Sequence, residues 1–115
     1  MKEYIFDIDD TICRRKSKKI KGYQKDNLIP NNKLIYYINK LYDNGFKITI
    51  ITGRGMLTKM DWRSETEKQL LFWGVKYHKL KFVKKPIDYL YVDDKACSPK
   101  AFLNKVKKEE KRGLI

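Results

Sequence analysis

The chain has 115 residues, 42% of them hydrophobic and 13% aromatic, and a formal net charge of +13. This length fits one domain over residues 1–115, and the hydrophobic fraction excludes a wholly disordered chain. Two cysteines without a C-x-x-C spacing exclude the disulfide framework of a small secreted protein, and no apolar run is long enough to span a membrane. We therefore expect a reduced, cytoplasmic protein with no membrane partner.

Four apolar and β-prone runs predict strands, at residues 3–8, 46–52, 80–83 and 89–92. The runs are nearly continuous and do not alternate with polar residues. This pattern is typical of strands that are buried on both faces of a parallel sheet.

Three further segments have the apolar spacing of helices, at residues 31–45, 64–74 and 98–111. The first ends at Gly45, a common helix stop. The second begins with Ser64 and has Glu67 three residues later, which predicts a capping box. The third begins with Ser98 as N-cap and Pro99 as first helical residue. Strands and helices alternate, which predicts an α/β fold: a Rossmann-like three-layer sandwich with a mostly parallel central sheet.

The first strand ends in a cluster of acids, FDIDDT. Asp7 and Asp9 are two residues apart, so on an extended chain both side chains lie on one side. Carboxylates this close repel, and a cation, a shared proton or neighbouring lysines must offset the repulsion. A second pair, Asp93 and Asp94, follows the run YLYV. If that strand lies beside the first and runs parallel to it, both pairs meet at one sheet edge, where their oxygens suit Mg²⁺.

The second strand ends in ITGR, a sequence suited to binding phosphate. The hydroxyl of Thr52 can donate a hydrogen bond to a phosphoryl oxygen, and Gly53 lets the backbone approach closely. Arg54 either binds the substrate or pairs with an acid. Downstream, the KKP sequence supplies ammonium groups shortly before the last predicted strand.

These motifs, DIDDT, ITGR, a Lys before DYLYVDD, and the DD pair, resemble in order the four motifs of the haloacid dehalogenase (HAD) superfamily of phosphotransferases. The resemblance spans roughly residues 1–103. The short length and the stretches ITGRGM and KKPIDYLYVDDKA further resemble small capless HAD proteins of capsule and sugar-biosynthesis gene clusters. No segment is long enough for an inserted cap domain, so the resemblance implies a HAD-like fold without a cap.

The resemblance also implies a Mg²⁺-dependent phosphomonoester hydrolase. Asp7 would attack phosphorus and form an aspartyl-phosphate, and Asp9 would move a proton to and from the reacting oxygens. Thr52 would hold the phosphoryl group, and Lys85, chosen because the related proteins place a Lys directly before Pro, would neutralise charge. Lys81 and Lys84 remain alternatives for this lysine. The other roles implied are substrate binding by Thr11, Gly53 and Arg54, and Mg²⁺ binding by Asp7, the backbone carbonyl of Asp9, Asp93 and Asp94.

Residues 14–25, RRKSKKIKGYQK, fit no predicted helix or strand. This basic stretch is either a flap that attracts an anionic substrate or a solvated loop. In a flap, Tyr23 would be a stacking residue. The net charge indicates a polyanionic or phosphorylated partner, or only the composition of an AT-rich genome. We expect a small phosphorylated metabolite, such as a sugar phosphate, as substrate. The alternatives are a polynucleotide 3′-phosphatase and a non-catalytic basic module that binds nucleic acid or protein; a homo-oligomer remains open.

Overall fold

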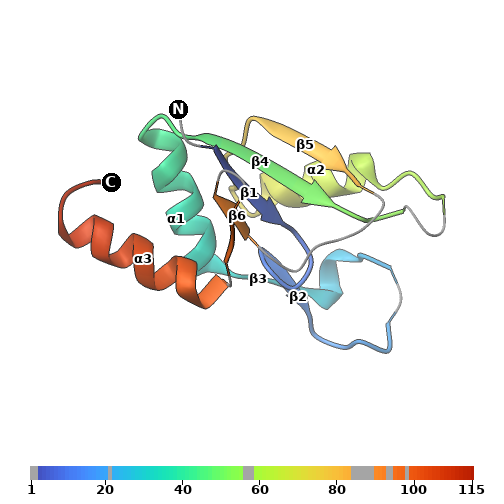
Figure 1. Ribbon diagram of the computed structural model, residues 1–115. Coiled ribbons are helices and arrows are strands. Elements are labelled where there is room, and N and C mark those ends of the chain that lie inside the picture. Colours follow the sequence, from blue (N-terminus) through green and yellow to red (C-terminus); the bar gives the residue numbers. More distant parts are fainter. Residues whose placement is uncertain (1–2, 21, 56–58, 84–89, 93–94, 98) are drawn as a thin grey trace.

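The computed structural model describes residues 3–20, 22–55, 59–83, 90–92, 95–97 and 99–115. They form an α/β fold built on a five-stranded sheet (Figure 1). The strand order is β5 (Lys79–Phe82), β4 (Lys47–Thr52), β1 (Glu3–Asp7), β6 (Leu90–Val92) and β7 (Lys95–Cys97). The first three of these run parallel, so the predicted α/β class with a mostly parallel central sheet is confirmed. The described residues include no cap domain between these elements.

The strand that precedes Asp93 and Asp94 differs from the arrangement assumed above. β6 lies beside β1, but it runs antiparallel to it, and the register pairs Val92 with Tyr4. The carboxyl end of β6 therefore lies near the first half of β1. Asp93 and Asp94 themselves lie outside the described residues, so their meeting with Asp7 stays a prediction, but the parallel pairing from which it was derived is wrong.

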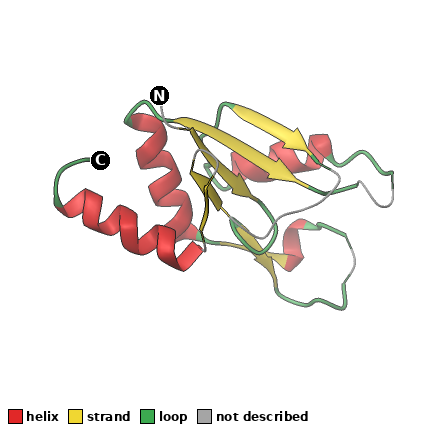
Figure 2. Ribbon diagram, viewed as in Figure 1, coloured by secondary structure: helices red, strands yellow, loops and turns green. Residues whose placement is uncertain are grey.

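The core centres on aromatic rings shared by the sheet and the last helix. Phe102 of α3 (Pro99–Lys111) contacts the rings of Tyr4 and Phe6 edge-on, with centroid distances of 5.9 and 5.4 Å. Helix α1 (Asn32–Asp43) lies beside α3, as Figure 2 shows, and Lys40 of α1 donates to Glu110 of α3 at 2.6 Å. The ring contacts and this ion pair fasten both helices to the same side of the sheet.

The helix ends follow local chemistry. Asn31 caps α1 by accepting a hydrogen bond from Leu34 N, and Gly45 ends the helical segment with a φ of +88°, as predicted. Helix α2 begins at Arg63 (Arg63–Phe72), so the capping box at Ser64 is wrong. Asp61 instead accepts from Arg63 N at 3.0 Å and satisfies a free amide of the first turn. In the described part of the chain, no helix is long and apolar enough to cross a bilayer.

Part of the basic stretch after β1 is ordered into a small ribbon. Strands β2 (Cys13–Arg15) and β3 (Leu28–Pro30) pair antiparallel, and the short 3-10 helix η1 (Lys25–Asn27) precedes β3. The side chain of Asn27 accepts from Ser17 N and donates to Ser17 O, both at 2.9 Å. These bonds hold the two sides of the stretch together below the sheet edge (Figure 1).

Candidate active site

The carboxyl ends of two neighbouring parallel strands form the centre of the site. Asp7 is the last residue of β1 and Thr52 is the last residue of β4. The register pairs Asp7 with Ile51, so Thr52 lies one position further along the adjacent strand. Both side chains are buried, with 2% and 0% of their surface exposed. The sheet therefore brings these two predicted site residues to the same edge.

The chain leaves β1 through a tight turn directly after Asp7. The carbonyl of Ile8 accepts hydrogen bonds from the amides of Thr11, Ile12 and Cys13, at 3.2, 2.8 and 3.0 Å. Ile8 N itself donates to the Asp7 carboxylate at 2.8 Å, which orients that side chain. From the sequence we expected the chain to be extended from Asp7 to Asp9. This is wrong, because β1 ends at Asp7 and Asp9 lies in the turn that follows.

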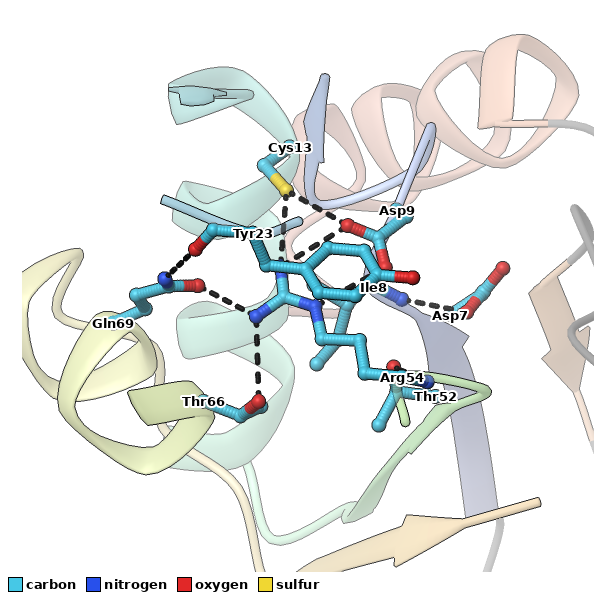
Figure 3. A network of polar contacts seen from close by, with 9 residues as sticks. All are labelled: Asp7, Ile8, Asp9, Cys13, Tyr23, Thr52, Arg54, Thr66 and Gln69. Atoms are coloured by element: carbon cyan, nitrogen blue, oxygen red, sulfur yellow. Dashed lines mark hydrogen bonds and ion pairs between the residues drawn. The ribbon is translucent and has the colours of Figure 1, made fainter. Parts of the chain in front are cut away.

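The carboxylate of Asp9 turns toward Arg54 (Figure 3). Arg54 Nε donates to Asp9 Oδ2 at 3.1 Å and Arg54 Nη2 donates to Asp9 Oδ1 at 3.0 Å. This two-point contact fixes both position and orientation of the carboxylate. Arg54 is thus paired with an acid, one of the two alternatives left open for it, while Asp7 lies outside this network in Figure 3.

Arg54 is almost fully buried, with 1% of its surface exposed, and polar groups surround its guanidinium. Nη1 donates to Gln69 Oε1 at 2.6 Å and to Thr66 Oγ1 at 3.3 Å, both on α2. The ring of Tyr23 lies over the guanidinium, 4.5 Å from Cζ to the ring centroid. Tyr23 is tied in place, since its carbonyl accepts a hydrogen bond from Gln69 Nε2. A buried cation needs this many partners to offset its lost hydration.

The thiol of Cys13 lies at the edge of the same network. It contacts Asp9 Oδ1 at 3.7 Å and Arg54 Nη2 at 3.8 Å. Burial, and secondly the negative charge of Asp9, raise the pKa of Cys13 to about 12. The group is therefore a neutral thiol at physiological pH, and it serves the site as a packing and weak hydrogen-bonding group.

The remaining predicted substrate contacts lie on the loops after β1 and β4. Thr11 is buried, with 3% of its surface exposed, and no described residue offers its Oγ1 a hydrogen-bond partner. Gly53 follows Thr52 directly and is half-buried. Gly55, two residues later, approaches the chain closely: a Cβ there would lie 2.0 Å from Met60 O, and its φ is +80°. Gly55 and Met60 line a cavity of about 290 Å³ together with Arg54.

Three predicted site residues lie outside the described residues, namely Lys85, Asp93 and Asp94, as does Lys84. Lys81 is described; it is exposed on β5. Within the described ranges no group of three or more His, Cys, Asp or Glu side chains is arranged to hold a metal ion. Asp7 and the carbonyl of Asp9 are oxygen donors of the kind that Mg²⁺ prefers, but they need further acids to complete a site.

Sequence reasoning missed the partners of Arg54 on α2. Thr66 and Gln69 are three residues apart on one face of that helix, and both are buried. A signal existed in the sequence, because polar residues at helical spacing beside Leu70 interrupt the apolar face of the helix. Such an interruption indicates a buried polar partner, and the buried arginine is that partner.

Comparisons with known proteins bear on the family and the fold of the chain. The family model described as "Polynucleotide kinase 3 phosphatase" matches residues 2–92. A crystal structure of a Vibrio cholerae protein is similar in fold, with a TM-score of 0.66 and 24% sequence identity over 96% of this chain and 99% of that one. The comparison with curated proteins found no match. The findings support a HAD-like phosphatase, and they do not point to the proteins of capsule and sugar clusters.

Proposed function

Because the chain belongs to the polynucleotide kinase 3 phosphatase family, we propose that it hydrolyses the terminal 3′-phosphate of a polynucleotide, with Asp7 as nucleophile. The observation that carries the proposal is the placement of Asp7 beside Thr52 at the ends of β1 and β4, with Asp9 held next to them by Arg54. The +13 net charge favours a polyanionic substrate over a singly phosphorylated metabolite.

In the first step, an Asp7 carboxylate oxygen attacks phosphorus while the bond from phosphorus to the 3′ oxygen breaks. Asp9 enters this step protonated and gives that proton to the leaving oxygen, so the polynucleotide departs with a 3′-hydroxyl and Asp9 becomes the carboxylate that Arg54 holds through both oxygens. In the second step, Asp9 takes a proton from water, and that water attacks the aspartyl-phosphate. Inorganic phosphate leaves and the Asp7 carboxylate is restored.

Two neighbours support these steps. Thr52 Oγ1 accepts a hydrogen bond from Arg54 N at 3.1 Å, so its own proton is available to a phosphoryl oxygen. Arg54 keeps the Asp9 carboxylate oriented through both of its oxygens. A carboxylate held this way needs little rearrangement to accept the proton of the attacking water.

Two described donors suit a magnesium ion, namely the Asp7 carboxylate and the backbone carbonyl of Asp9. Asp7, the carbonyl of Asp9, Asp93 and Asp94 would hold it, and the bound ion would neutralise phosphate charge. Lys85 would add a positive charge on the same group, with Lys81 and Lys84 as the alternatives. Activity is therefore expected to disappear with EDTA and to return when Mg²⁺ is added in excess.

The test is phosphate release from a panel: a 3′-phosphorylated oligonucleotide, a nucleoside 3′-monophosphate and several sugar phosphates, each with and without Mg²⁺. We expect the oligonucleotide to have the highest kcat/KM and Asp7→Asn to remove activity. The matched control is Asp43→Asn, an exposed acid on α1 that pairs with Lys76. A higher kcat/KM for sugar phosphates would contradict the polynucleotide substrate and favour a small metabolite. Activity in Asp7→Asn would contradict the role of Asp7 as nucleophile.

A further inference from the structure

A cavity of about 460 Å³ opens between the end of the basic stretch and α2. Its walls come from segments that are far apart in the sequence. They include Tyr23, Lys25, Trp62, Lys68, Phe72 and Trp73. None of these residues has a role in the chemistry proposed above.

The cavity is joined to the catalytic network through shared side chains. Tyr23 lines the cavity and also covers the guanidinium of Arg54, which holds Asp9. Trp62 meets the Tyr23 ring edge-on, at a centroid distance of 5.3 Å. Trp62 also lines a second cavity, of about 290 Å³, together with Arg54. A ligand in the larger cavity would thus be separated from Asp9 by the side chains of Tyr23 and Arg54.

The side chains that line the cavity are suited to a ligand that has a flat ring and a negative charge. Phe72 has 70% of its surface exposed, unusual for an aromatic side chain beside a cavity. Lys25 Nζ lies 4.6 Å from the Phe72 ring centroid, and Lys68 adds a second ammonium group. Glu65 is the one acid among the described residues of the wall. Aromatic faces with neighbouring cations are the combination that single-stranded nucleic acids use, with bases stacked on rings and phosphates beside lysines.

We propose that this cavity binds a nucleobase of a single-stranded polynucleotide, stacked against Phe72 and Trp62, while the 3′-phosphate end of the same strand reaches Asp7. The inference rests on the proposed function and adds a second point of recognition to it. It explains how an enzyme without a cap would distinguish a polynucleotide from a lone nucleotide: the first engages both the phosphate site and the cavity.

The test measures binding apart from turnover. Fluorescence anisotropy with a labelled short oligothymidylate that ends in a 3′-hydroxyl reports the dissociation constant, with no phosphate to hydrolyse. We expect Phe72→Ala to weaken binding about tenfold, the loss of one stacked base. The conservative Phe72→Trp should keep wild-type affinity. The matched control is Leu71→Ala, because Leu71 is the preceding residue, is 81% exposed and does not line the cavity.

A second measurement locates the stacked base. Oligothymidylates with a single abasic site at each position in turn should bind normally except at one position, where binding weakens about tenfold. In Phe72→Ala, an abasic site at that position should no longer weaken binding. Equal affinity for all abasic variants, or an unchanged constant in Phe72→Ala, would overturn the inference.

The outcomes separate this inference from the proposed function. If 3′-phosphorylated oligonucleotides release no phosphate but binding depends on Phe72, the proposed function fails and the base-binding cavity stands. If phosphate is released and neither Phe72→Ala nor base removal changes binding, the proposed function stands and the cavity proposal fails.

Discussion

Arg54 and Asp9 form a two-point ion pair in which Nε and Nη2 donate to the two carboxylate oxygens at 3.1 and 3.0 Å. The two partners differ in exposure, since the Arg54 side chain is fully buried and the Asp9 side chain is 30% exposed. Contacts with buried side chains of α2 fix the position of Arg54, and Arg54 in turn fixes the carboxylate of Asp9 at the surface of the site. Loss of Arg54 should therefore affect both folding and catalysis.

We expect Arg54→Ala to lower the free energy of unfolding by about 2–3 kcal/mol, because Thr66 and Gln69 lose their buried partner. Urea denaturation measures this change. Arg63→Ala is the control, since Arg63 is exposed, pairs with Glu67 and lies over the Phe82 ring at 4.7 Å, contacts whose loss should cost about 1 kcal/mol or less. Equal losses in the two variants would show that the buried network contributes no special stability.

The same pair has a kinetic consequence. In Arg54→Lys the charge remains, but a single ammonium group cannot hold both carboxylate oxygens. Because Asp9 then loses its fixed orientation, kcat should fall about 10²-fold while the KM changes little. Phosphate release under conditions where the variant is folded gives both constants. A rise in KM at constant kcat would indicate instead that Arg54 binds the substrate directly.

Gly55 should be the least replaceable of the described glycines in the loop after β4. A Cβ at this position would lie 2.0 Å from Met60 O, so Gly55→Ala must displace the loop that follows Arg54. Gly45→Ala is the matched control: its φ is also positive, at +88°, but no atom lies within 4 Å of the added carbon. Thermal unfolding should show a loss of about 1 kcal/mol for Gly45→Ala and a clearly larger one for Gly55→Ala. Similar losses would mean that only the backbone angle matters.

The sequence predicted the sheet and the strand-end residues because these depend on local patterns. Apolar runs mark β1 and β4, and parallel pairing of the two runs places Asp7 and Thr52 at one edge. The direction of β6 was beyond sequence reasoning, since an apolar run of a few residues fits either orientation.

The partners of Arg54 were missed for a different reason. The side chain bridges the β1 turn, the basic stretch and α2, which are far apart in the chain. A motif reports which residue types recur at a strand end, whereas this network depends on how three segments pack around one guanidinium. The helix start at Arg63 was missed because Asp61, two residues earlier, accepts from the Arg63 amide, where a Ser64–Glu67 box was expected to satisfy the amides of the first turn.

Glu110 fastens α3 to α1 in a way that should depend on pH. Hydrogen bonds from Lys40 first, and from Tyr36 and Tyr37, lower the pKa of Glu110 below its ordinary value of 4.5. A lowered pKa means that the folded state prefers the charged carboxylate, so the stabilisation is present above pH 4.5 and is lost as the pH falls through the folded-state pKa. Glu110→Gln should lower the melting temperature at pH 7 and reduce its fall in acid. The control is Glu67→Gln, an exposed acid that pairs only with Arg63; an identical acid profile in Glu110→Gln and wild type would contradict the assignment.

Cys13 should be inert toward thiol reagents in the folded protein. Burial is the main cause that raises its pKa from 9.0 to about 12, so at pH 8 almost no thiolate is present. In a Cys97→Ser background, where Cys13 is the remaining thiol, the native protein should react with an aromatic disulfide reagent far more slowly than the urea-unfolded protein.

The raised pKa of Cys13 also fixes the sign of its effect on stability. The folded state prefers the neutral thiol, so its contribution is complete below pH 9.0 and is lost as the pH rises toward about 12. The free energy of unfolding should therefore fall more steeply above pH 9 in the Cys97→Ser protein than in the same protein with Cys13→Ala, which has no thiol to ionise. Parallel pH profiles for the two proteins, or rapid native labelling at pH 8, would show that the thiol beside Asp9 and Arg54 is less enclosed than their contacts indicate.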